Sequence, residues 1–403
     1  MELTIATTQL LDLSREYGTP LYVYHTETIQ RQYQKMVQAF EKLDVKIFYA
    51  CKALTNIHVL KYIHSLGCNI DCSSSNEVLL ALKAGFTPER ILYTSNGICF
   101  SEIEAVADTG AFVNIDSLSN LEKFGKKFGS SYPVGVRLRP NIMAGGHMKI
   151  ATGHDKSKFG IATDQLSLLK DIVDKYEINI HTLHIHTGSD ISDAKVFMQG
   201  LEFLFEILPQ FPTVKVLDLG GGFKVPYHPS EKETDLNSLA QVLEDAIKSH
   251  PATKDRPLQL WFEPGKFLVS QCGYLLTKVN VLKEQSDLSI AGIDTGLNHL
   301  IRPMMYDAYH HITNLSASGK PERKYMVTGN ICETDTFSEA CLLPEIQEGD
   351  VLAIHNAGAY GFEMSSSYNA RFRPAEVLVS AGRPTLIRRR ENLDDLLRNQ
   401  TIS

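Results

Sequence analysis

Residues 46–53 read KIFYACKA, a short β-rich run that is the first of eight such runs along the chain. The other seven lie at residues 69–74, 90–95, 112–117, 133–140, 179–188, 214–222 and 258–265. Helical spacing of apolar residues fills most of the intervals, as at Leu236, Leu239 and Leu243. Eight alternations of strand and helix predict a (β/α)8, TIM-like barrel over residues 25–265; an open doubly wound sheet would be preferred with five or six units.

The chain changes character after the eighth run. From residue 266 onward helical spacing fades and β-like runs dominate, at residues 267–281, 325–328, 351–354, 375–379 and 385–387. The early run at residues 20–24 has no place in a closed barrel of eight strands, so we expect it to join the later ones. Residues 1–24 and 266–403 are therefore predicted to form a C-terminal all-β domain that also takes in the N-terminus.

Composition excludes several classes of partner. Asp and Glu outnumber Lys and Arg by 47 to 40 without a basic run, which argues against nucleic-acid binding and favours a small-molecule substrate. The N-terminus lacks a signal-peptide pattern and no stretch of about 18 apolar residues occurs, so we expect a cytoplasmic protein without a membrane partner. The seven cysteines include no pair at two-residue spacing, which disfavours a disulfide framework or a zinc knuckle.

The active site of such a barrel lies at the carboxyl ends of its strands, and the first strand ends at Lys52. A strand-end lysine is ordinarily a solvated surface residue. Here its neighbours are small and apolar, and a site that removes water from it would lower its pKa. The amine would then be a nucleophile able to form an imine with an aldehyde.

Three further strand ends carry polar groups. His184 and His186 share a face of the sixth strand and could bind zinc, but no third ligand is evident, and an imidazole can also stack on a planar cofactor ring. Gly220–Gly222 could cradle a phosphate, although a tight turn explains them equally well. Glu263 follows an apolar strand and needs a positive partner, such as a protonated pyridine nitrogen.

Together these strand ends resemble those of the barrel-type pyridoxal phosphate decarboxylases, and within them the diaminopimelate decarboxylase family. The resemblance covers Thr19 to about Gly382. Its motifs are Tyr49–Ala53, His186–Ser189, Gly220–Gly222, Glu263–Gly265, Arg302, Pro303 and Tyr306, Cys332 and Glu333, and Gly358–Tyr360. It implies a fold type III enzyme with an alanine-racemase-like barrel.

The resemblance also implies roles in holding pyridoxal 5'-phosphate. Lys52 would carry the cofactor, His186 would stack on its ring, and Glu263 would face the ring nitrogen. Ser189 and the three glycines Gly220, Gly221 and Gly222 would bind the phosphate, with Tyr360 close to it. No metal is expected.

For the substrate, the resemblance implies that Arg302 and Tyr306 hold a distal carboxylate and that Glu333 holds a distal ammonium, with Tyr360 nearby. Cys332 would be the acid that protonates the product. Cys332 and Glu333 would reach across from a second subunit, which implies a homodimer with shared active sites.

Two positions depart from the family pattern. Lys266 stands where the family has Arg, so a two-pronged grip on a carboxylate is lost at this substrate-facing position. The acid that follows the Cys-Glu motif is displaced by one residue to Asp335, for which we expect no role.

The function that the resemblance implies is decarboxylation of meso-2,6-diaminopimelate to L-lysine and carbon dioxide. The alternatives are a decarboxylase for ornithine, arginine or a carboxylated polyamine such as carboxynorspermidine, a racemase, and a non-catalytic cofactor carrier or regulatory pseudoenzyme. Glu263 disfavours the racemase, because racemases of this type put Arg against the ring nitrogen. The long glycine-rich connection at residues 141–160 is expected to be a mobile lid.

Overall fold

The computed structural model describes residues 2–142, 157–254, 256–317 and 319–401. The chain divides into two compact units. We call them the barrel unit (Gln32–Val225 and Lys232–Phe267) and the β-rich unit (Met1–Arg31, Pro226–Glu231 and Leu268–Ser403). Most of the predicted lid, residues 143–156, lies outside the described residues. No helix in the described ranges has the length and apolar character needed to cross a membrane.

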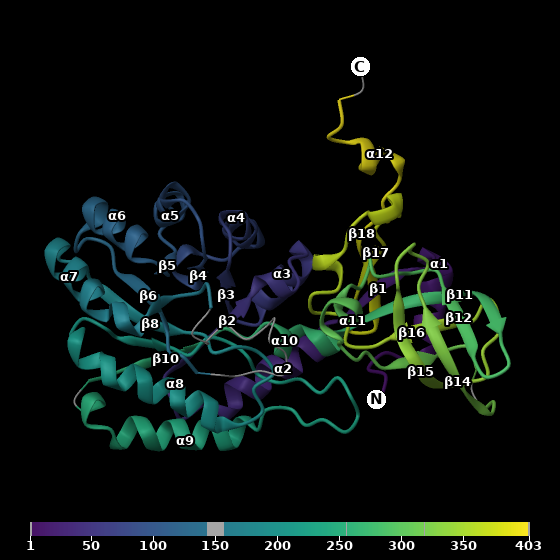
Figure 1. Cartoon of the computed structure of the whole chain (residues 1–403), viewed down its shortest axis with the longest axis horizontal. Coiled ribbons are helices and arrows are strands. Elements are labelled where there is room, and N and C mark those ends of the chain that lie inside the picture. The colour runs from purple at the N-terminus through teal and green to yellow at the C-terminus, as the bar shows by residue number, and fades with distance from the viewer. Residues whose placement is uncertain (1, 143–156, 255, 318, 402–403) are drawn as a thin grey trace. The chain divides into compact units, whose positions relative to one another are not determined.

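Eight parallel strands of the described chain close into a ring in the barrel unit, which confirms the predicted (β/α)8 barrel (Figure 1). The ring runs β5-β4-β3-β2-β10-β9-β8-β6 and closes because β6 pairs with β5. A short strand, β7 (Ile161–Ala162), adds to β6 outside the ring. The ring strands are β2 (Val45–Ala50), β3 (Asn69–Cys72), β4 (Ile91–Thr94), β5 (Phe112–Ile115), β6 (Val134–Arg139), β8 (Ile180–Ile185), β9 (Val216–Asp218) and β10 (Gln259–Phe262).

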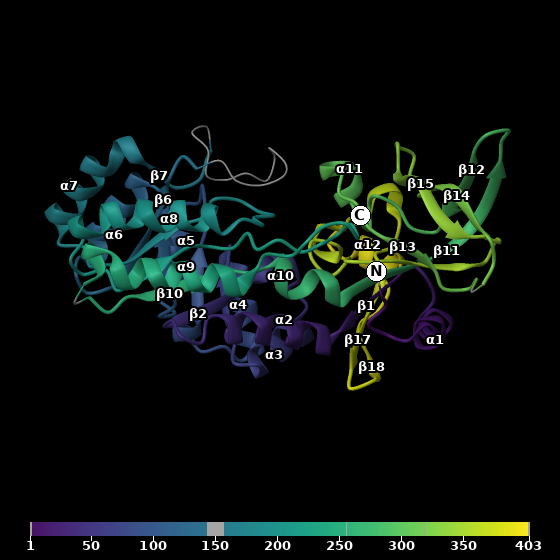
Figure 2. The same ribbon diagram turned by 90° about the horizontal axis from the view of Figure 1, so that it is seen from below.

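Helices surround the ring, and α8 shows why they do. Its Phe197, Leu201, Leu204 and Phe205 recur at helical spacing and are all buried, so one face of the helix packs against the strands. Asp193 caps its first turn by accepting the Lys195 N–H at 2.9 Å. α8 lies beside α9 in both ribbon views (Figure 2). The helices are α2 (Thr26–Ala39), α3 (Ile57–Ser65), α4 (Ser75–Ala84), α5 (Phe100–Ala107), α6 (Leu118–Phe128), α7 (Leu166–Tyr176), α8 (Ala194–Ile207) and α9 (Leu236–Ser249).

A cluster of apolar side chains packs among the strands of the barrel. Trp261 is 1% exposed and packs with Phe48, Leu92 and Val216. The ring centroids of Phe48 and Trp261 are 4.6 Å apart, and Phe112 meets Trp261 edge-on at 5.0 Å. This packing leaves the strand ends as the place where polar side chains can gather.

The β-rich unit is built on a sheet of mostly antiparallel strands, in the order β15-β14-β12-β11-β1-β17-β18. The early strand β1 pairs with β11 and β17, as expected for a strand that joins the later ones. The strands are β1 (Leu21–His25), β11 (Gly273–Glu284), β12 (Ser289–Ile293), β13 (Ile312–Asn314), β14 (Glu322–Thr328), β15 (Thr336–Pro344), β16 (Val351–Ile354), β17 (Ala375–Ser380) and β18 (Arg383–Arg388).

This unit also contains helical segments that the sequence pattern did not indicate. The predicted run at residues 267–281 is helical in its first part, as α10 (Lys266–Val269), which begins in the barrel unit and ends in the β-rich unit, and as a 3-10 turn at Ser270–Cys272. The reason is that a short apolar run has no periodicity to separate strand from helix. α1 (Thr7–Tyr17), α11 (Arg302–Tyr306) and α12 (Leu393–Leu397) likewise interrupt the predicted all-β character.

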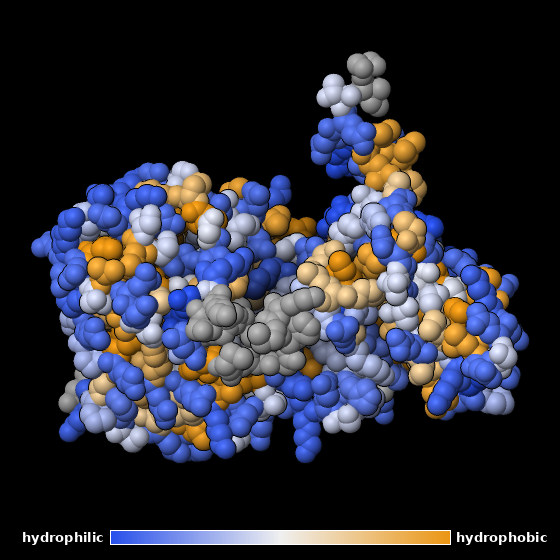
Figure 3. Space-filling view, in the orientation of Figure 1, coloured by the Kyte–Doolittle hydropathy of each residue, from blue (hydrophilic) through white to orange (hydrophobic). Residues whose placement is uncertain are grey.

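Hydrophilic and hydrophobic residues are mixed on the face of the molecule shown in Figure 3. Exposed apolar side chains of the barrel unit, such as Leu79 and Leu168, come from different helices, α4 and α7. Scattered exposure of this kind is ordinary for a globular surface, so these residues do not indicate a site.

Candidate active site

Four neighbouring strands of the ring, β2, β10, β9 and β8, bring the predicted cofactor residues to one end of the barrel. Lys52 follows β2, Glu263 follows β10, the three glycines follow β9, and His186 follows β8. Because the strands are parallel, their carboxyl ends meet at the same rim. The order of the strands in the ring is therefore enough to bring the predicted cofactor residues of the barrel unit together.

Lys52 is paired with a carboxylate that was not among the predicted site residues. Its Nζ lies 3.1 Å from Oδ2 of Asp71 on β3; the Lys52 side chain is 43% exposed and that of Asp71 is 1% exposed. Burial, reinforced by Glu263, raises the pKa of Asp71 to about 7, although Lys52 opposes the shift. The signal that could have indicated Asp71 is an acid inside the buried strand NIDC.

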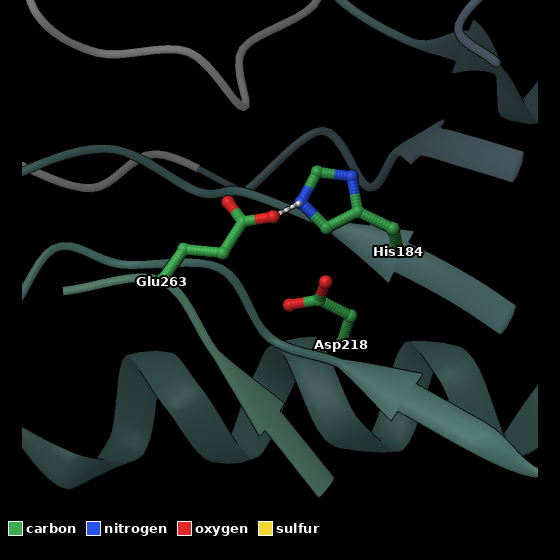
Figure 4. A group of neighbouring side chains, drawn as sticks. All are labelled: His184, Asp218 and Glu263. Carbon is green, nitrogen blue, oxygen red and sulfur yellow. Dashed lines mark ion pairs between the residues drawn. The ribbon is translucent and has the colours of Figure 1, made fainter. Parts of the chain in front are cut away.

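Glu263 is the buried anion of the site. It is 7% exposed, and its Oε1 lies 3.4 Å from His184 Nε2 (Figure 4). Burial opposes its ionisation, but His184 and Lys52 outweigh this and hold the pKa of Glu263 well below its usual range. Glu263 is therefore ionised at neutral pH and can face a cationic ring nitrogen.

Asp218 on β9 is a second carboxylate in this group, and it has the opposite character. Burial and the charge of Glu263 raise its pKa well above its usual range. Its Oδ1 accepts the Gly220 N–H at 2.9 Å. The environments of these two buried carboxylates therefore act in opposite directions, since they lower the pKa of Glu263 and raise that of Asp218.

The expectation that no third zinc ligand is present was wrong, because the structure brings together three residues of the kinds that bind metals. His184, Asp218 and Glu263 offer ligand atoms within 4.8 Å of one another, whereas His186 is outside this group. The arrangement is better explained as the electrostatic environment of Glu263.

His186 lies one residue beyond β8 and is fixed by the glycine turn, since its Nδ1 accepts the Gly221 N–H at 3.2 Å. Burial lowers the pKa of His186 to about 3, so its ring is neutral. A Cβ on Gly220 would come within 2.7 Å of His186 Nδ1, and one on Gly221 within 2.4 Å of the Glu263 carbonyl. Only glycine lets these three strand ends approach so closely.

The features around Ser189 fit a phosphate. Its Oγ is buried without a hydrogen-bond partner among the described residues. A Cβ on Gly222, whose φ is +104°, would come within 2.5 Å of the Gly188 carbonyl. A buried hydroxyl beside a closely packed glycine turn is what a bound phosphate would satisfy. Together with the anionic Glu263 and the strand-end Lys52, the residues present fit pyridoxal phosphate.

Lys266 begins α10 and is bound to Asp190, with 2.6 Å between Nζ and Oδ1 and a side chain only 10% exposed. Asp190 has a φ of 62°, which places it in the left-handed region. Lys266 therefore has a partner within its own unit, and its predicted contact with substrate stays a prediction.

The remaining predicted residues belong to the β-rich unit. Arg302 and Tyr306 come together on α11, with the Arg302 guanidinium 5.9 Å from the Tyr306 ring and 5.2 Å from the Tyr227 ring. Arg302 is 8% exposed, and its Nε has no hydrogen-bond partner in the described part of the chain. A buried guanidinium between two aromatic rings is suited to a carboxylate.

Tyr360 follows β16 and has a φ of 55°, in the left-handed region. The glycine of its motif is explained by packing, because a Cβ on Gly358 would come within 1.9 Å of the Val269 carbonyl. This packing and the unusual backbone angle fix the position of the tyrosine.

Cys332 and Glu333 lie exposed in the turn between β14 and β15. Asp335, for which no role was expected, holds this turn: its carboxylate accepts the N–H groups of Leu297 at 2.7 Å and Ile331 at 3.1 Å. Tyr368 donates its hydroxyl hydrogen to Glu333 Oε1 at 2.9 Å. Sequence spacing offered no signal for Tyr368.

Comparison with known proteins agrees with this geometry. Residues 26–270 match the family model described as "Pyridoxal-dependent decarboxylase, pyridoxal binding domain". The diaminopimelate decarboxylase of Methanothermobacter thermautotrophicus is 39% identical, over 99% of this chain and 96% of that protein. That of Aquifex aeolicus is 37% identical over 98% and 94%.

Solved structures give the same result. The crystal structure of diaminopimelate decarboxylase from M. jannaschii in complex with L-lysine is 31% identical, with a TM-score of 0.89, and the match covers 98% of this chain and 94% of that one. The chain therefore belongs to the pyridoxal-dependent decarboxylases and, within them, to the diaminopimelate decarboxylase family.

Proposed function

We propose that this protein decarboxylates meso-2,6-diaminopimelate to L-lysine and carbon dioxide with pyridoxal 5'-phosphate. The main support from the site is the ionised, buried Glu263 on the strand next to Lys52. The choice of substrate is supported by relatives named diaminopimelate decarboxylase that match almost the whole chain. When bound, pyridoxal phosphate supplies an aldehyde that links to an amine and a cationic ring that accepts the electrons of the breaking bond.

In this proposal the barrel residues hold and tune the cofactor. Lys52 would hold the cofactor through its amine, and the free amine would serve in release of the product. Glu263 would keep the ring nitrogen protonated, and the neutral His186 would pack on the ring face. The buried hydroxyl of Ser189 and the glycine turn at Gly220–Gly222 bind the phosphate, with Tyr360 nearby.

Asp71 prepares Lys52 for this role. It lies 3.1 Å from the lysine amine, and a pKa of about 7 lets it gain or lose a proton near neutral pH. We assign Asp71 to orient the Lys52 amine whenever the amine is free and to accept its excess proton.

The β-rich unit recognises the distal end of the substrate. Arg302, with Tyr306 beside it, binds the distal carboxylate, and Glu333 binds the distal ammonium. Lys266, which is paired with Asp190, is proposed to contact the substrate as well. Cys332 delivers its S–H proton to the substrate carbon that has lost carbon dioxide, and the thiolate then regains a proton from water.

The active unit is proposed to be a homodimer in which Cys332 and Glu333 complete the site of the partner subunit. Their exposure on a tight turn is compatible with this arrangement. We also place the enzyme in the cytoplasm, a proposal supported by seven cysteines that are all free thiols. The division into functional domains at residues 25–265, with residues 1–24 and 266–403 forming the other domain, likewise remains a proposal.

The rival functions have less support. Decarboxylases for ornithine, arginine or carboxylated polyamines act on substrates without a distal amino-acid centre, for which the pairing of Arg302 with Glu333 would be unnecessary. A non-catalytic carrier would not need Cys332 or Glu333. The test is release of carbon dioxide by the cofactor-loaded enzyme from meso-diaminopimelate, ornithine, arginine and carboxynorspermidine in parallel. Preference for any of the last three would overturn the proposed substrate.

A further inference from the structure

Two turns of the β-rich unit meet at Cys332. Asn369 Nδ2 lies 3.1 Å from Cys332 Sγ, and its Oδ1 lies 3.4 Å from the same sulfur. The hydroxyl of Tyr368 lies 3.9 Å from Sγ and donates to Glu333 at 2.9 Å. Neighbouring residues of one turn thus contact the two residues to which the proposed function assigns proton delivery and recognition of the distal ammonium.

We propose that the Tyr368–Asn369 turn is the positioning device of this half-site, in which Asn369 orients the Cys332 thiol and Tyr368 fixes the Glu333 carboxylate. The inference deepens the proposed function and rests on it for the roles of Cys332 and Glu333. The contacts themselves are independent of those roles.

The Asn369 amide suits a sulfur that changes its protonation state. Its carbonyl oxygen can accept the S–H of the thiol, and its N–H2 group can donate to the thiolate that remains after the proton has left. Both atoms lie within hydrogen-bonding reach of Sγ. Asn369 therefore holds the sulfur in place before and after proton delivery without transferring a proton itself.

The backbone of the turn supports a positioning role. Asn369 and Ala370 have φ values of 58° and 54°, two successive residues in the left-handed region. Such conformations persist where the surroundings hold them, and they cluster at functional sites. Here Ser366 N–H donates to the Asn298 carbonyl at 2.7 Å, and Arg371 Nη2 donates to the Asn330 carbonyl at 3.3 Å.

The charged and titratable groups around the Cys332 sulfur belong to the same two turns. The hydrogen bond to Glu333, followed by the contact with Cys332, raises the pKa of Tyr368 to about 12, so its hydroxyl remains a donor at neutral pH. Among the described residues the titratable or charged groups that face Cys332 are Glu333 and Tyr368, with Arg371 beyond the Asn330 carbonyl. The amide of Asn369 is the neutral group in direct contact with the sulfur.

The decisive experiment measures alkylation of Cys332 by iodoacetamide in the holoenzyme as a function of pH, with peptide mass spectrometry as the readout. Cys99, the other exposed thiol, is an internal reference in the same sample. The midpoint of the profile reports the thiolate population and does not depend on access to the sulfur.

Two variants of Asn369 distinguish the effect of its side-chain amide from the effect of its backbone conformation. Asn369→Gly keeps the left-handed conformation and removes the amide, and Asn369→Asp keeps the shape but replaces the donor with an anion. Losing a donor to the thiolate should move the Cys332 midpoint up by about one pH unit in Asn369→Gly, and further in Asn369→Asp. The Cys99 midpoint should not move. In Asn369→Gly, kcat should fall about tenfold while KM stays within about twofold.

Tyr368→Phe tests the other half of the turn. It should raise KM for meso-diaminopimelate about fivefold and move the Cys332 midpoint less than Asn369→Gly does. Ser367→Ala, a change in the same turn, is the matched control. It should alter neither KM for meso-diaminopimelate nor the Cys332 midpoint. An unchanged Cys332 midpoint in both Asn369 variants would overturn the proposal. Since alkylation requires no turnover, this result stands whether or not the enzyme accepts meso-diaminopimelate, and failure of that substrate would overturn only the proposed function.

Discussion

The Lys52 amine and the Asp71 carboxylate lie 3.1 Å apart, with the carboxylate buried and the amine reaching toward solvent. Burial makes Asp71 a carboxyl with a pKa of about 7, close to the pH at which the enzyme would work. The residue that we propose to carry the cofactor thus lies beside a group that can take up or release a proton.

The first prediction concerns stability in the cofactor-free protein. A carboxyl whose pKa rises from 3.8 to about 7 on folding binds its proton more tightly in the folded state, so its contribution to stability falls as pH rises through that window. Asp71→Asn, a neutral isostere, removes this dependence. The free energy of unfolding of the variant should therefore gain about 4 kcal/mol relative to wild type between pH 4 and pH 8. A difference between the two proteins that does not change with pH, measured by urea unfolding, would contradict the shifted pKa.

The second prediction compares the two buried carboxylates in Figure 4. Glu263→Gln should retain cofactor but lose at least about 100-fold in kcat, because a neutral amide cannot keep the ring nitrogen protonated. Asp218→Asn is the matched control. Burial raises the pKa of Asp218 well above its usual range and so favours its neutral form, and its neutral isostere should therefore lower kcat by less than about tenfold. Equal losses in the two variants would show that the division of charge between them is wrong.

The third prediction tests the shared active site. Lys52→Ala and Cys332→Ala should each be inactive, and mixed dimers should contain one site free of both changes. Random exchange of subunits should then restore about a quarter of the wild-type activity. Mass spectrometry of tagged subunits would establish that exchange had occurred. Continued inactivity after exchange would place Cys332 in the site of its own subunit.

The fourth prediction concerns substrate choice. Removing one partner of a desolvated charge pair costs about 2 to 5 kcal/mol, so Glu333→Gln should lower kcat/KM for meso-diaminopimelate at least tenfold. Cofactor absorbance should be unchanged. An analogue without the distal amine should lose much less, since its complex never contained the deleted pair. Equal losses for the two substrates would remove Glu333 from recognition of the ammonium.

The barrel and its strand-end residues could be predicted because their signals are local and repeated. Each strand places its last polar residue at the same rim, so Lys52 and Glu263 needed only the alternation of strands and helices to be grouped. Asp71 and Asp218 carry a related signal, an acid inside a buried strand, which could have been used in the same way. The boundary at α10 could not be predicted, because Phe267–Val269 is equally compatible with helix and strand.

The β-rich unit was harder to interpret for a physical reason. Cys332 and Asn369 lie 37 positions apart in sequence, and their contact depends on how two irregular turns pack. No periodicity links such turns, and the left-handed backbone of Asn369 and Ala370 has no unique sequence signature. Family resemblance supplied Cys332 and Glu333, but the residues that hold them became evident only from the structure.

The most direct test of the central claim is the stoichiometry of carbon dioxide and L-lysine formed from meso-diaminopimelate by the cofactor-loaded protein. Wild type should release the two products in equal amounts, and borohydride should fix the cofactor to the peptide that contains Lys52. Lys52→Ala should lose both properties, whereas Lys83→Ala, a change of an exposed lysine on α4, should keep them. Lysine formation by Lys52→Ala at the wild-type rate, or none by the wild-type protein, would contradict the account.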